Sequence, residues 1–107
     1  MLNIWKTLLK MNKLFIKPQH LKMLTDIFNS YCPKAEIWAY GSRIKGNAHD
    51  GSDLDLVVKN FNSKTAKLYE LKQLINDSNI PFLVDINEFD ELPKSFQQEI
   101  EKDYIIL

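Results

Sequence analysis

The chain has 107 residues, with 14 basic and 14 acidic side chains and no formal net charge. This length is that of one small domain, and the sequence holds no run of about 18 apolar residues that could span a bilayer. Zero net charge argues against a protein that binds nucleic acid through bulk charge, because such domains carry an excess or a stripe of basic residues.

The N-terminal segment and the single cysteine bear on organisation and compartment. Residues 1–16 place apolar side chains roughly on one helical face with lysines opposite, which is typical of a helix packed on a core or partner, or of a membrane-surface helix; we favour the former. We therefore expect an N-terminal extension over 1–17 and the main domain over 18–107. Cys32 excludes an intrachain disulfide, and no export signal is evident, so we expect a cytoplasmic protein with Cys32 as a small buried hydrophobe.

The first half of the domain reads as helix, strand and loop. Pro18 suits a first helical turn, and apolar residues follow at three- and four-residue steps as far as Tyr31. Residues 35–40 (AEIWAY) alternate and are rich in strand formers. Residues 41–52 hold all three glycines, which indicates a loop, and this loop opens with a short helical turn.

The second half continues the alternation. A strand begins at Asp53 and runs over 54–58, a helix extends from Ser63 to about Asp77, and residues 81–86 (PFLVDI) form a third strand. The last helix begins near Ser95, where a capping-box pattern precedes apolar residues at every fourth position. Three strands alternating with helices predict a small sheet covered mainly on one face, which leaves the other face available for a site.

Three aspartates are the candidate catalytic and metal-binding residues. Side chains two apart on a strand share a face about 6.5–7 Å apart, so Asp53 and Asp55 point the same way while their apolar neighbours face the core. Carboxylates at that spacing can straddle two divalent cations about 3.5–4 Å apart. Asp85 lies in the strand 81–86, among apolar residues where an unpaired carboxylate would be costly. If this strand pairs in register with 53–58, Asp85 joins the other two, and bound Mg²⁺ is the simplest relief of their repulsion.

The loop before these aspartates predicts phosphate binding. Gly41 lets the backbone approach a phosphate closely, the Ser42 hydroxyl and free amides can hold one, and Arg43 adds positive charge. A triphosphate held here would be presented to metals held by the aspartates. The competing interpretation is a polar turn followed by a strand with two solvated aspartates.

Gly41-Ser42, followed after ten residues by Asp53-Leu54-Asp55, resembles the signature of the DNA polymerase beta-like nucleotidyltransferase superfamily. More narrowly, the chain resembles the minimal nucleotidyltransferases that occur as antitoxins beside HEPN-domain toxins. The likeness runs from about residue 18 to 107 through four motifs: AEIWAYGSRIKG, SDLDLVV, PFLVDI and ELPKSFQQEIEKDYIIL.

The resemblance implies an α+β fold with a mixed three-stranded sheet in the order α-β-α-β-α-β-α. It implies that Asp53 and Asp55 bind two Mg²⁺, that Asp85 is the third carboxylate, and that Gly41 and Ser42 hold the nucleotide phosphates. The implied activity is transfer of AMP from ATP to a hydroxyl, a tyrosine on a partner HEPN ribonuclease toxin, within a hetero-oligomer.

Two other functions stay open at this point. The chain could neutralise a toxin by binding alone, or it could modify a small molecule as aminoglycoside nucleotidyltransferases do. Two aromatic residues also have alternative roles. Trp38 could stack on an adenine, although core packing or partner contact is favoured. The tail 104–107 could form an interface, although we expect Tyr104 and Ile105 to close the core.

Overall fold

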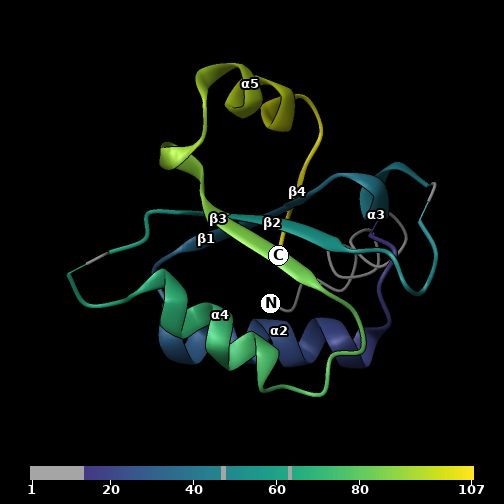
Figure 1. The fold of residues 1–107 in the computed structure, drawn as a ribbon, viewed down its shortest axis with the longest axis horizontal. Helices are drawn as coiled ribbons and strands as arrows, with labels where there is room; N and C mark the ends of the chain where they lie inside the picture. Colours follow the sequence, from purple (N-terminus) through teal and green to yellow (C-terminus); the bar gives the residue numbers. More distant parts are fainter. Residues whose placement is uncertain (1–13, 47, 63) are drawn as a thin grey trace, which may run out of the picture.

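The computed structural model describes residues 14–46, 48–62 and 64–107 (Figure 1). The helix predicted near the N-terminus falls mostly on residues 1–13, which lie outside the described residues. Residues 14–17 lead into the first described helix without helical structure, and Leu14 is only 1% exposed because it packs into the core. Within the described ranges no helix has the length and apolarity needed to cross a membrane.

The described strands form one mixed sheet in the order β3-β2-β1-β4. β1 pairs antiparallel with β2 and with β4, and β2 pairs parallel with β3. The mixed sheet is confirmed, but the predicted number of three strands is wrong. The additional strand β4 has two residues, too few to show an alternating pattern in the sequence. The strands are β1 (Glu36–Tyr40), β2 (Leu54–Lys59), β3 (Val84–Glu88) and β4 (Ile105–Ile106).

The helices follow the predicted order, with shifted boundaries. The helix predicted from Ser63 begins five residues later, at Leu68, because the backbone carbonyl of Asn62 accepts from the N–H groups of Thr65 and Ala66 in a turn. Ser63 itself is outside the described residues. The helices are α2 (Pro18–Tyr31), α3 (Ser42–Lys45), α4 (Leu68–Asn76), the 3₁₀ turn η1 (Phe89–Glu91) and α5 (Lys94–Lys102).

One face of the sheet carries the main core, beneath α2 and α4 (Figure 1). Leu54, Leu56 and Val58 of β2 all point into it and are buried, which confirms the predicted alternation. The hydroxyl of Tyr31 donates to the backbone carbonyl of Lys67 and accepts from its N–H, so the end of α2 is tied to the start of α4.

The opposite face is only partly covered, by η1 and α5 (Figure 1). Trp38 is buried there, and the Tyr104 ring stacks on it with a centroid separation of 3.9 Å. Ile105 packs against the main core instead. These contacts confirm the expected core roles of Trp38, Tyr104 and Ile105. Helices therefore lie mainly, but not entirely, on one face, and the sheet row beside Trp38 is the one that carries the acidic residues.

Candidate active site

A row of three polar side chains crosses the uncovered part of the sheet. Tyr40 of β1 is the register partner of Asp55 of β2, which in turn is the register partner of Asp85 of β3. Directly opposed residues in a sheet place their side chains on the same face. The parallel pairing of β2 with β3 is therefore the in-register arrangement that the sequence argument required to bring Asp85 to Asp55.

Asp53 immediately precedes β2, and its exposed side chain adds a third negative charge to this end of the sheet. The pKa of the half-buried Asp55 carboxyl is raised, first by burial and then by the negative charges of Asp85 and Asp53. The carboxylates are therefore close enough to disfavour one another's ionisation, as the sequence predicted for a converging set.

Tyr40 is a member of the row that the sequence analysis did not single out. Burial, followed by the negative charges of Asp55 and Asp85, raises the pKa of its hydroxyl to about 12. The residue remains a neutral phenol at physiological pH. Its place at the end of AEIWAY was visible in the sequence, but only the β1–β2 register shows that it lies opposite Asp55.

Gly41 brings the backbone against the central carboxylate. A Cβ at this position would lie 2.5 Å from Oδ2 of Asp55, a separation that real Cβ atoms essentially never show. The backbone also has φ +83° and ψ −153°, a region that is essentially restricted to glycine. Two independent constraints therefore require glycine here, and Ser42 follows directly as the first residue of α3.

Arg43 points away from open solvent and is only 2% exposed. Its Nε and one terminal nitrogen donate to the carbonyl of Ser52, and that same nitrogen also donates to the carbonyl of Asp50. The other terminal nitrogen donates to the carbonyl of Phe15. The guanidinium also lies 4.1 Å from the centroid of the Phe82 ring. Arg43 thus ties the loop that leads into Asp53 to the segment that precedes α2.

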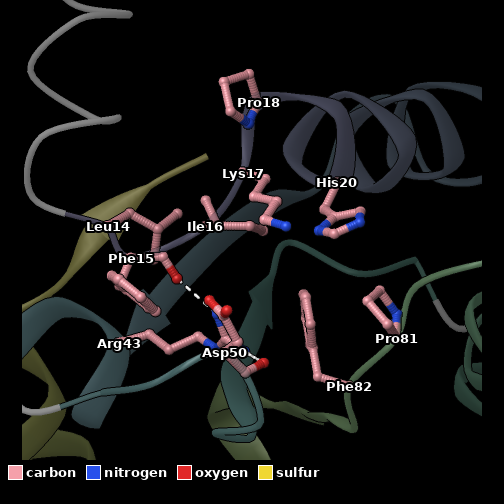
Figure 2. Close-up of a pocket in the computed structure, with 10 residues that line it drawn as sticks. All are labelled: Leu14, Phe15, Ile16, Lys17, Pro18, His20, Arg43, Asp50, Pro81 and Phe82. Carbon is pink, nitrogen blue, oxygen red and sulfur yellow. Dashed lines mark hydrogen bonds between the residues drawn. The ribbon is translucent and has the colours of Figure 1, made fainter.

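A cavity of about 380 Å³ surrounds this arginine. Figure 2 shows Lys17, just before α2, and His20 of α2 on one side of it. Asp50 and Phe82 line it from the other side. None of the three aspartates borders this cavity, so it is separate from the carboxylate row.

The carboxylate row has the chemistry of a divalent-cation site. In the described part of the chain no salt bridge joins Asp53, Asp55 or Asp85 to a cationic side chain, and Asp85 accepts only a 3.3 Å hydrogen bond from the amide of Asn87. The described residues include no group of three side chains already gathered around a metal position. Hard oxygen donors with uncompensated charge are nevertheless the ligands that Mg²⁺ prefers, so the residues present fit this ion.

The sequence matches the family described as polymerase beta, nucleotidyltransferase, over residues 22–107. The α+β fold with its mixed sheet agrees with that match. The chain therefore belongs to the polymerase beta-like nucleotidyltransferase family and is an enzyme of that class. Members of this family generally use a divalent metal ion and a nucleoside triphosphate.

The chain is also similar to an individual protein of known sequence. The chain is 30% identical over 96 residues to a probable protein adenylyltransferase, MntA, of Haemophilus influenzae, which covers 89% of this chain and 84% of the relative. The similarity therefore extends over most of both proteins.

Proposed function

We propose that this nucleotidyltransferase transfers AMP from ATP to a hydroxyl of a partner protein, a tyrosine of a HEPN-type ribonuclease toxin, and thereby acts as an antitoxin. The observation that carries the proposal is the in-register Asp55–Asp85 pair with Gly41 packed directly against it. The name of the Haemophilus influenzae relative supports adenylyl transfer to protein.

The roles of the site residues follow from their positions. Gly41 and Ser42 hold the phosphates of ATP, because the backbone at Gly41 is unobstructed by a Cβ and the Ser42 hydroxyl is adjacent. Asp85 accepts the proton of the attacking hydroxyl. The new bond forms between that oxygen and the α-phosphorus, the bond from the α-phosphorus to the bridging oxygen breaks, and pyrophosphate leaves.

Asp53, Asp55 and Asp85 would together hold two Mg²⁺ ions. When bound, these ions lower the pKa of the attacking hydroxyl and neutralise charge on the triphosphate. In the absence of cations the repulsion between the three carboxylates is what raises the pKa of Asp55 after burial, so cation binding relieves a cost already present in the fold.

Arg43 acts as a positioning residue in this proposal rather than as the nucleotide ligand predicted from the sequence. Its guanidinium donates to the carbonyls of Asp50 and Ser52, which lie three residues and one residue before Asp53. Arg43 therefore fixes the path of the loop that delivers Asp53 to the site.

A protein partner and the cytoplasm complete the proposal. Asp53 and Asp85 are exposed in the part of the chain that the structure describes, so an acceptor side chain on another protein can approach them. Cys32 is a buried free thiol, which fits a reducing compartment.

The test is the intact mass of a HEPN-domain ribonuclease after incubation with this chain, ATP and Mg²⁺. We expect the partner to gain the mass of one or more AMP units, and peptide mapping should place them on a tyrosine. The matched control is the variant Asp53→Asn, Asp55→Asn, which keeps the side-chain shapes and removes two charges, and which should give no gain.

Neutralisation of the ribonuclease by both versions, with tight complex formation and no change in mass, would contradict the proposal. That result would identify an antitoxin that works by binding. Transfer of AMP to an aminoglycoside but not to the protein would contradict it in favour of a small-molecule enzyme.

A further inference from the structure

A second, smaller cavity of about 230 Å³ adjoins the carboxylate row. Tyr40 and Gly41 form its inner end, and these are the residues that contact Asp55 by strand pairing and by close packing, respectively. α5 lines the cavity through Phe96, Glu99 and Ile100. The cavity is therefore continuous with the proposed site, although no residue of it belongs to the aspartate set.

The volume of this cavity limits what it can hold. Sites for complete drug-sized ligands have volumes of about 300–1,000 Å³. A space of about 230 Å³ accommodates one ring system rather than a whole nucleotide. A nucleotide that used it would have to leave its phosphates outside, on the side of Gly41 and the carboxylates.

The walls favour a flat aromatic ring with polar edges. The rings of Tyr40 and Phe96 meet at 87° with a centroid separation of 5.8 Å, so they form a corner that offers both a ring face and a ring edge. Ile100, which is buried, adds an apolar surface. Lys45 offers a donor, and Glu99, whose Oε1 accepts from Lys102, has a second carboxylate oxygen as acceptor. A donor and an acceptor together match the ring nitrogen and the exocyclic amino group of adenine.

We propose that this Tyr40–Phe96 cavity binds the adenine base of the ATP substrate. The proposal rests on the nucleotidyl transfer proposed above, and it assigns the base to α5 and the phosphates to the loop at Gly41. Phe96 is then a residue that binds the nucleotide through its base alone. Its side chain is 41% exposed, and a bound base would cover part of that apolar surface.

The test compares two ligands by isothermal titration calorimetry in the presence of Mg²⁺: ATP, which has a base, and inorganic tripolyphosphate, which does not. We expect Phe96→Ala to raise the Kd for ATP about 10-fold, a typical loss for removing an aromatic stacking partner. The Kd for tripolyphosphate should stay within about twofold of the unmodified value. Phe96→Leu keeps apolar volume but has no ring. Its Kd for ATP should lie between those of the unmodified protein and Phe96→Ala.

The matched control is Leu74→Ala on α4, because Leu74 is 42% exposed and lies on the helix that covers the other face. This variant should bind both ligands normally, and thermal unfolding should show that each variant is folded. An unchanged Kd for ATP in Phe96→Ala, or an equal loss for both ligands, would overturn the base assignment.

The calorimetry also separates this inference from the activity on which it rests. If the unmodified protein binds ATP and tripolyphosphate but Phe96→Ala changes neither, only the base assignment fails. If the unmodified protein binds neither ligand in Mg²⁺, the proposed nucleotidyl transfer fails with it.

Discussion

At the scale of single residues, Gly41 packs directly against Asp55 and so joins the loop that follows β1 to the acidic row. The glycine is adjacent to the carboxylate because β1 ends at Tyr40, directly opposite Asp55, and the chain turns at the next residue. A side chain at Gly41 would occupy the space where the Asp55 carboxylate lies.

This contact predicts a loss of activity in Gly41→Ala. The new Cβ would displace the Asp55 carboxylate, and displacement of such a group by about 1 Å costs on the order of 100-fold in rate. AMP transfer measured by mass spectrometry tests this. Gly46→Ala is the control for a positive φ: Gly46 has φ +81° and ψ 4°, a left-handed conformation that alanine adopts at lower cost than the conformation of Gly41, and its Cβ would meet nothing within 4 Å. Equal losses of activity in both variants would show that the backbone conformation, and not displacement of the Asp55 carboxylate, causes the loss.

The raised pKa of Asp55 predicts how pH affects stability in the absence of metal. The folded state binds the Asp55 proton more tightly than the unfolded chain does, so the free energy of unfolding falls as pH rises from 3.8 through the raised pKa. Asp55→Asn removes this loss. We therefore expect the variant to unfold at a higher temperature than the unmodified protein at pH 7 without metal, and at a similar temperature below pH 3.8.

Mg²⁺ should reverse that order at pH 7. A cation at 100 times its Kd adds about 2.7 kcal/mol to the free energy of unfolding of the unmodified protein. The cation should add little to the free energy of unfolding of Asp55→Asn, because this variant lacks the charge of one of the ligands. Asp90→Asn, at an exposed acidic residue in η1, is the control and should respond to Mg²⁺ as the unmodified protein does. Thermal unfolding with and without Mg²⁺ measures both effects, and equal stabilisation of all three proteins would contradict the metal assignment.

At the scale of elements, the C-terminal segment acts as the cover of the second face. α5 and the two residues after it bring Ile100 and Tyr104 onto Trp38, and β4 then pairs with the free edge of β1. The 14 residues from Lys94 to Leu107 therefore cover the apolar cluster around Trp38 and pair with one edge of the sheet.

Loss of the stacked ring should destabilise the protein. We expect Tyr104→Ala to lower the free energy of unfolding by about 2–4 kcal/mol, because it removes a large aromatic side chain that packs at 3.9 Å on Trp38. Urea denaturation measures this. Tyr69→Ala removes the same side chain where it is 72% exposed, so its effect should stay within about 0.5 kcal/mol. Comparable effects at both positions would show that the stacking contributes no stability.

The sequence patterns predicted some properties of the helices and strands better than others. The alternation in β2 identified the buried and exposed sides of the strand, because side-chain direction follows from period two alone. The bounds of α4 and β3 were less accurate, since a turn at Asn62 and the bend at residues 81–82 delay both elements. The turn at Asn62 is set by its own hydrogen bonds, which the helical spacing of apolar residues does not reveal.

At the scale of the whole molecule, equal numbers of acidic and basic residues argue against binding of nucleic acid through bulk charge. We expect a labelled single-stranded RNA to bind with a Kd no tighter than about 100 µM near physiological salt, because the term that drives such binding is neutralisation of phosphates by excess basic charge. Fluorescence anisotropy tests this. A micromolar Kd that weakens steeply with added salt would contradict it.

The amino-acid sequence was sufficient to predict the class of enzyme, which the family match confirms, and to propose the candidate residues. Gly41-Ser42 and the two aspartates are adjacent or nearly adjacent along the chain, so their chemistry is readable from spacing, and strand periodicity places both aspartates on one face.

Only the tertiary structure decided which residues meet across strands. The β2–β3 pairing brings Asp85 to Asp55, although 30 positions separate them in the sequence, and the β1–β2 pairing adds Tyr40. The structure likewise shows that Arg43 is buried and donates to backbone carbonyls, partners that its charge and its place in the sequence did not predict. The physical reason is the same in each case: register and burial are set by the packing of segments distant in sequence, and local composition carries no information on which segments these are.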